Sequence, residues 1–68
     1  MELNQIVSRD VDILSGTLCF TGTRVPAQSL IDHLKAGDSL EEFLEGFPSV
    51  SRAQAEAFLQ FAFNSAAI

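Results

Sequence analysis

The sequence predicts a mainly α-helical domain, in which a three-helix, helix-turn-helix-like bundle follows a short N-terminal β-arm or hairpin. Its 68 residues suffice for a single domain (1–68) with a thin hydrophobic core. The chain changes character near residue 25, from β-branched residues, Gly and Thr to apolar residues at helical spacing. Two capping-box spacings further on mark the starts of additional helices.

The β-arm is expected over residues 5–25. Ser15-Gly16 and Thr21-Gly22 are turn signals within it. Around these turns stand apolar residues typical of short strands: Ile6, Val7, Val11, Ile13, Leu18 and Phe20.

The first helix is expected over residues 26–36. Pro26 fits the first helical position, where its missing N–H is not needed. Gly37 fits a left-handed C-terminal cap. One face of this helix is apolar and consists of Ala27, Leu30, Ile31 and Leu34.

The second helix is expected over residues 39–47. Asp38 or Ser39 can cap it, paired with Glu41 or Glu42 as a capping box. Pro48 stops it. Its apolar face consists of Leu40, Phe43, Leu44 and Phe47.

The third helix is expected over residues 51–64. Ser51 and Gln54 repeat the capping-box spacing at its start. Its core stripe consists of Ala55, Phe58, Leu59 and Ala62. The tight connection of residues 46–50 before it is typical of a helix-turn-helix, and equally of a generic three-helix bundle.

Charge and composition restrict the possible functions. Nine acidic residues against four basic ones give a net charge of −5. This is the wrong sign for a free-standing nucleic-acid binder, and it suits a basic partner. One Cys and one His exclude a disulfide framework and a Cys/His zinc cluster, so no metal or cofactor is expected.

The sequence predicts a cytoplasmic protein that does not enter a membrane. The longest uncharged run, residues 57–68, has 12 residues, against the ~20 needed to span a bilayer. The N-terminus is acidic and lacks the basic flank and apolar core of a signal peptide. The lone Cys19 suits a reducing compartment.

The run Gly22-Thr23-Arg24-Val25-Pro26 is not explained by helix chemistry alone. Together with residues 37–44 and 47–51, it resembles the family called domain of unknown function 433. The resemblance extends from about Ile6 to Ala62. It implies a homeodomain-like, winged-helix-like fold of the kind seen in VapB-type antitoxins, with a PIN-like ribonuclease toxin as partner.

The arm departs from the pattern of that family at two places. Val11 stands where family members usually have Pro, and Thr17-Leu18 replaces Lys-Pro. The second change removes a positive charge from the arm.

Ser51, Arg52 and Gln54 are the candidate DNA-binding residues. They stand at the start of the third helix, which reads base edges in a helix-turn-helix, and Arg and Gln pair with guanine and adenine. The same residues also suit a helix cap followed by a solvated face. The preceding helix carries carboxylates that would repel the phosphate backbone: Asp38, Glu41, Glu42 and Glu45.

Arg24, Glu41, Glu45 and Phe63 are the candidate partner-binding residues. Arg24 could contact a phosphate or a partner carboxylate, but internal bonds to backbone carbonyls or to the nearby aspartates of the arm are favoured. Phe63 lies off the core stripe, beside Arg52 and a glutamate on the helical wheel. It either covers the β-arm or contacts another protein.

No catalytic residue is predicted. Glu41 and Glu45 could share a helix face, but nothing in the chain supplies a nucleophile, an orienting histidine or a phosphate loop beside them. A solvated face is therefore expected. Cys19 and His33 form the one conceivable thiol–imidazole pair, and Cys19 is expected mid-strand among apolar residues.

The resemblance to this family implies an antitoxin-like helix-turn-helix protein that neutralises a PIN-like ribonuclease toxin and represses its operon as a complex, and the residues predict that it is non-catalytic. The alternative is a dimeric DNA-binding transcriptional regulator without a toxin partner. A small structural dimerisation module is a third possibility. A homodimer is expected in each case, because a thin core with strand edges and an off-stripe Phe63 gains from pairing.

Overall fold

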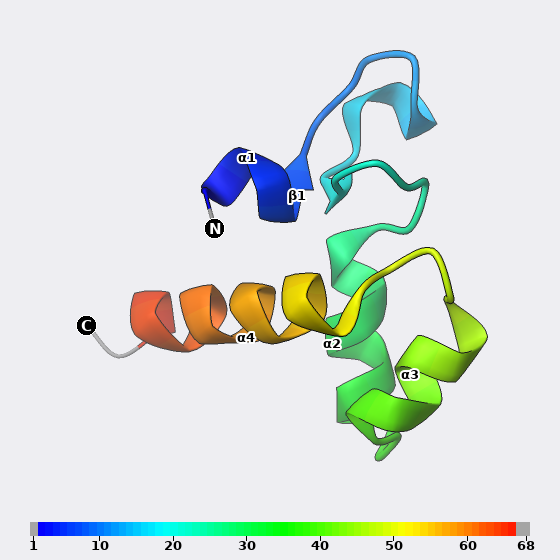
Figure 1. The fold of residues 1–68 in the computed structure, drawn as a ribbon, viewed down its shortest axis with the longest axis vertical. Helices are drawn as coiled ribbons and strands as arrows, with labels where there is room; N and C mark the ends of the chain where they lie inside the picture. Colours follow the sequence, from blue (N-terminus) through cyan, green and yellow to red (C-terminus); the bar gives the residue numbers. More distant parts are fainter. Residues whose placement is uncertain (1, 67–68) are drawn as a thin grey trace.

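Three main helices follow a short two-stranded hairpin in the computed structural model, which describes residues 2–66 (Figure 1). The mainly helical fold class is confirmed. Met1, Ala67 and Ile68 of the predicted domain lie outside the described residues. The elements in chain order are α1 (Leu3–Ile6), β1 (Val7–Ser8), the 3₁₀ turn η1 (Leu14–Gly16), β2 (Cys19–Phe20), α2 (Ala27–Lys35), α3 (Leu40–Gly46) and α4 (Arg52–Ala66).

The hairpin is antiparallel and pairs Val7 with Phe20 and Ser8 with Cys19. On its other side, β2 contacts the segment that leads into α2. Phe20 N–H donates to Val25 O at 3.0 Å. Ala27 N–H, the first of α2, donates to the carbonyl oxygen of Leu18 at 2.9 Å. The short strand β2 therefore ties α1 and β1 to the start of α2.

The regular strands are much shorter than the arm predicted over residues 5–25. Ile6 ends α1 instead of lying in a strand, and Val11 lies in a turn, 80% exposed. Asp10 explains the turn, because its carboxylate accepts the Asp12 N–H at 2.9 Å and its carbonyl accepts the N–H three residues on. Two more residues expected in strands lie outside them: Ile13 and Leu18.

A left-handed turn at η1 closes the loop of the hairpin. Leu14 and Ser15 have φ values of 49° and 57°, a conformation that costs about 1–2 kcal/mol for a residue with a Cβ. Two hydrogen bonds hold it: Arg9 Nη1 donates to Gly16 O at 3.0 Å, and Thr17 Oγ1 donates to Leu14 O at 2.8 Å. The hydrogen bond from an arginine to a backbone carbonyl, which was expected of Arg24, is therefore made by Arg9.

The ends of α2 are set by Pro26 and Gly37. Pro26 has an extended backbone (φ −61°, ψ 137°) because it pairs with β2, so it stands at the N-cap, one residue before its predicted place. Gly37 has φ 94°, and its N–H donates to Leu34 O at 3.1 Å. Asp38 N–H donates to His33 O at 3.0 Å, which completes a Schellman cap and turns the chain toward α3.

Both predicted capping boxes are present. Before α3, Ser39 Oγ accepts the Glu42 N–H at 3.1 Å and Glu42 Oε1 accepts the Ser39 N–H at 2.9 Å. Before α4, Ser51 Oγ accepts the Gln54 N–H at 3.0 Å and Gln54 Oε1 accepts the Ser51 N–H at 3.2 Å. A cap of this kind stabilises a helix by about 1 kcal/mol, and each helix starts within one residue of its predicted position.

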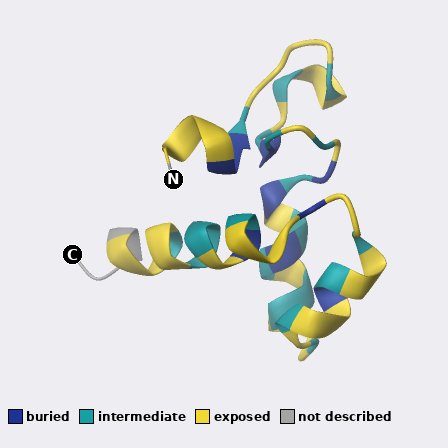
Figure 2. Cartoon of the chain, viewed as in Figure 1, coloured by how far each residue is buried: buried dark blue, intermediate teal, exposed yellow. Residues whose placement is uncertain are grey.

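Phe20, Leu30 and Phe43 are fully buried at the centre of the core. Figure 2 shows the buried residues where the hairpin, α2, α3 and the first turns of α4 meet. The Phe20 ring lies 5.6 Å from that of Phe58 in an edge-on contact and 6.3 Å from that of Phe43. Most of the predicted helix faces pack in this core or against it: Ala27, Leu30, Leu34, Leu40, Phe43, Leu44, Phe47, Ala55, Phe58 and Leu59.

Gln54 connects α4 to the N-terminal part of the chain. Its Nε2 donates to Thr21 O at 3.0 Å and, more weakly, to Gln5 O at 3.4 Å and Ile6 O at 3.5 Å. Its Oε1 meanwhile caps α4. One amide therefore fixes the start of α4 and holds α1 and the turn after β2 against it.

The substitution Gln54→Glu should lower the free energy of unfolding at pH 7 by about 1–3 kcal/mol, because it replaces the Nε2 donor by an oxygen that faces carbonyl oxygens. The capping oxygen is retained, so the loss reports on the contact between α4 and the N-terminal segments. The measurement is urea denaturation followed by circular dichroism. Gln60→Glu, the same change at an exposed position of α4, is the control, and an equal loss in both variants would contradict the role of Gln54.

Candidate functional site

The connection between α3 and α4 determines how the candidate residues are presented. Phe47 N–H donates to Phe43 O at 3.0 Å, and Val50 N–H donates to Phe47 O at 3.0 Å. Val50 is buried in the core. The turn is therefore anchored in the core by Val50, and the first turn of α4 starts beside α3 (Figure 1).

Arg52 bridges α3 and α4. Its Nη2 lies 2.8 Å from Glu41 Oε1, and its Nη1 lies 3.4 Å from Glu56 Oε2. Arg52 donates this hydrogen bond to the Glu41 carboxylate, which lowers the pKa of Glu41 and raises the pKa of Arg52. All three side chains are at least half exposed, so water screens these ion pairs and each contributes little to stability.

The three candidate DNA-binding residues lie together at the start of α4, and each has an internal partner. Ser51 belongs to the capping box, Arg52 is held by two carboxylates, and the Gln54 amide bonds to carbonyls of the N-terminal segments. A base edge would have to replace these contacts. Their role in DNA binding stays a prediction.

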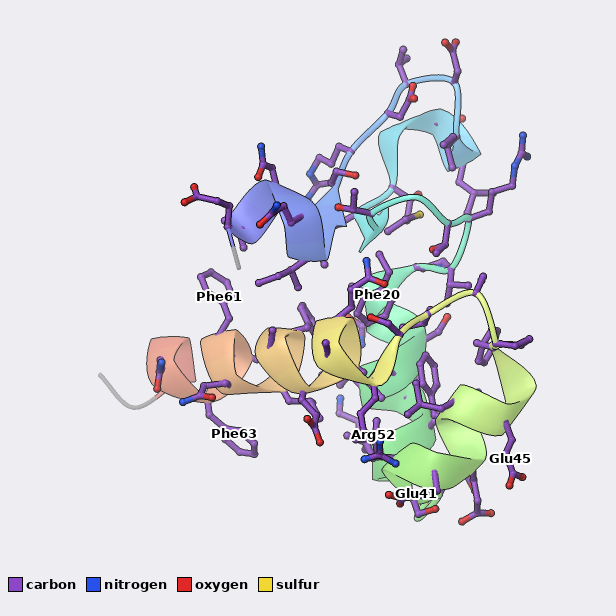
Figure 3. All side chains as sticks on the ribbon, viewed as in Figure 1. Phe20, Glu41, Glu45, Arg52, Phe61 and Phe63 are labelled. Carbon is purple, nitrogen blue, oxygen red and sulfur yellow. The ribbon has the colours of Figure 1, made fainter. Side chains whose placement is uncertain are left out.

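Glu41, Glu45 and Phe63 lie on one side of the molecule. Figure 3 shows the two glutamates pointing outward from α3 and Phe63 pointing outward from the far end of α4, so that they border one side of the view with Phe63 and Glu45 at its two ends. Glu45 is exposed and has no ion-pair partner within residues 2–66. Phe63 is 73% exposed, so its ring does not cover the β-arm. It is accessible for the contact with another protein that the sequence suggested as the alternative.

Arg24 lies apart from the other candidate partner-binding residues. The segment that carries it, residues 21–26, lies with the hairpin, on the side of α2 away from α3 (Figure 1). Arg24 is exposed, and in the described part of the chain no hydrogen bond or ion pair holds it. The internal lock that was favoured for Arg24 is therefore not formed there.

Cys19 and His33 have separate surroundings in the structure. Cys19 is buried in β2, whereas the His33 Nδ1 lies 2.9 Å from Asp38 Oδ2 and its ring packs edge-on against Phe43 and Phe47. Between residues 2 and 66, no three His, Cys, Asp or Glu side chains converge in a way that could hold a metal ion.

Two residues near Phe63 extend the candidate surface beyond those predicted. Glu56 and Leu59 line an open hollow of about 400 Å³ together with Gln60, Phe63 and Asn64. The spacing of Glu56 four residues after Arg52, and of Phe63 four after Leu59, is the signal in the sequence that places all of them along one side of a helix.

Acid should weaken the contribution of the Arg52–Glu41 pair to stability. The pKa of Glu41 is lower in the folded chain than its ordinary value of 4.5. The contribution of ionised Glu41 to the free energy of unfolding is therefore complete above pH 4.5 and is lost as the pH falls through the lowered pKa. The difference in unfolding free energy between wild type and Glu41→Gln, measured by urea denaturation at low salt, should therefore shrink between pH 7 and pH 3. Arg52→Gln should show the same pH trend, and an unchanged difference at both pH values would contradict the pairing.

Within residues 2–66, none of the helices is long and apolar enough to cross a membrane.

No solved structure matches the chain. A curated relative, "Uncharacterized protein y4eO" of Sinorhizobium fredii (strain NBRC 101917 / NGR234), is 44% identical over 46 residues, which are 68% of this chain and 21% of that protein. The chain thus spans about a fifth of the length of that relative. The family described as "Protein of unknown function (DUF433)" matches residues 7–62, which confirms the resemblance, and the chain belongs to the DUF433 family.

Proposed function

We propose that this domain is a non-catalytic, antitoxin-like module that binds a basic protein partner, a PIN-like ribonuclease, and neutralises it by covering its RNA-binding surface. The observation that carries the proposal is the common side occupied by Glu41, Glu45 and the exposed ring of Phe63 (Figure 3). It combines an apolar anchor with negative charge, as a protein partner of positive charge requires.

Charge supplies the means of neutralisation. A ribonuclease binds the phosphates of RNA with lysine and arginine side chains. The chain has a net charge of −5 and presents exposed carboxylates on α3. These carboxylates would occupy the cationic side chains that otherwise hold RNA, so inhibition needs no reaction on the part of the domain.

The direct test is inhibition of a PIN-like ribonuclease encoded beside the gene for this chain. Adding the chain should suppress cleavage of a fluorogenic single-stranded RNA at equimolar concentration. Glu45→Lys reverses an exposed charge at the proposed interface and should raise the inhibitory constant about fivefold, the equivalent of ~1 kcal/mol.

Asp12→Lys is the matched control for this experiment. It makes the same change of charge in the turn of the hairpin, where the Asp12 side chain is exposed. It should inhibit like wild type. A ribonuclease that is not inhibited at all, or equal losses in the two variants, would contradict the proposal.

DNA binding is the second candidate function, and the α3–turn–α4 arrangement is the observation that favours it. The turn is anchored by Val50, Ser51 caps α4, and Arg52 and Gln54 lie in its first turn, as in a recognition helix. The internal contacts of these residues and the carboxylates of α3 oppose binding by the isolated domain. A basic partner that covered the carboxylates would remove this repulsion.

Mobility-shift assays across a salt series should therefore show weak, salt-sensitive DNA binding by the free chain and tighter binding by its complex. In the complex, Arg52→Ala should cost about 1–3 kcal/mol at a specific site and relax the preference at one base pair. Lys35→Ala, on α2, is the control for the loss of one positive charge. Strong operator binding by the free chain, unchanged in Arg52→Ala, would contradict both the dependence on the partner and the role of Arg52.

A further inference from the structure

One side of α4 runs along the edge of the core, where Leu59 is half-buried against the core and the side chains of Arg52, Glu56 and Phe63 are exposed. Arg52, Glu56, Leu59 and Phe63 follow one another at spacings of four, three and four residues, so their side chains lie within about 60° of one another around the helix. Figure 3 shows Arg52 and Phe63 on this side and Phe61 on the opposite side, toward α1. We call residues 56, 59, 60, 63 and 64 the outer surface of α4.

The outer surface is hollowed but has no opposite wall. The hollow of about 400 Å³ is open, and all the residues that line it belong to α4. Phe63 forms one border and is 73% exposed. A single helix can provide only one side of a binding site, so another polypeptide segment would have to provide the other side.

The charges beside the hollow select the kind of segment. Glu56 lines the hollow, and Glu41 is joined to it through Arg52. Two carboxylates share one guanidinium, so this group keeps one negative charge. A second copy of the chain has the same net charge of −5 and would be repelled, whereas lysine and arginine side chains would be attracted.

We propose that the outer surface of α4 is the docking site for a basic amphipathic helix of the partner, which inserts an apolar side chain beside Phe63 and Leu59 and places a cationic side chain on Glu56. Arg52 is a positioning residue that orients the two carboxylates. The proposal deepens the proposed function and rests on it for the identity of the natural partner, the ribonuclease. It adds Glu56 and Leu59 to the contact residues.

A pair of designed helical peptides tests the chemistry of the surface without the ribonuclease. Both have about 18 residues and the same leucine stripe, and they differ in carrying arginine or glutamate at the other positions. Titration of the ¹⁵N-labelled full chain should shift the amide resonances of residues 56–64 with the arginine peptide. The glutamate peptide should produce no such shifts.

Substitutions on opposite sides of α4 give the matched comparison. Phe63→Ser should weaken binding of the arginine peptide about tenfold or more, whereas Phe61→Ser, on the side toward α1, should leave the affinity unchanged. Glu56→Gln should weaken binding about threefold and reduce its dependence on salt. Circular dichroism of each variant shows whether the helices are intact.

Three results would overturn the docking site: equal binding of the two peptides, shifts confined to another part of the chain, or shifts at residues 56–64 on dilution of the free chain, which would mean that a second copy covers the surface.

The test also separates this proposal from the proposed function. Inhibition of the ribonuclease with shifts elsewhere would reject the docking site alone. Peptide binding at residues 56–64 without any inhibition would reject the ribonuclease as the partner and retain the site.

Discussion

The edge-on contact between the rings of Phe20 and Phe58, 5.6 Å apart, is the interaction on which the arrangement of the domain depends. Phe20 is fully buried, and its ring also packs against Phe43 of α3. The hairpin thereby reaches two helices through one side chain. Truncation of such a ring costs about 3–5 kcal/mol, a large part of the roughly 3–10 kcal/mol expected for a domain of this size. Together with the hydrogen bonds of Gln54, this contact holds α4 against the rest of the domain.

Polar contacts at the start of α4 and apolar exposure at its far end give the two halves of the helix different roles. Gln54 and Arg52 are held by groups of the same chain. Phe63, three turns after Arg52, has an exposed ring. The first half therefore serves to fix the helix on the domain, and the second half extends beyond the core with side chains free to contact another molecule (Figure 1).

The helices could be predicted closely because their signals are local. Ser39 with Glu42, and Ser51 with Gln54, act across three residues, and Gly37 acts at its own position. The arm was less predictable, since β-branched residues do not reveal that Asp10 reverses the chain or that Ile6 ends a helical turn. Gln54 shows the limit most clearly. Its capping role is visible in the sequence, whereas its carbonyl partners lie 33 to 49 residues away, and only the fold brings them near. The Arg52–Glu41 contact is hidden for the same reason.

The first and last helices pack against each other, and this has a consequence for how such a domain can be carried by a larger protein. A polypeptide that enters through α1 and leaves through α4 does so on the same side of the domain. The rest of a longer chain would then continue with little separation between the parts before and after it. The curated relative is about five times longer than the segment it shares with this chain. Within such a protein, a unit of this shape would form a side branch, with α2 and α3 turned away from the point of attachment.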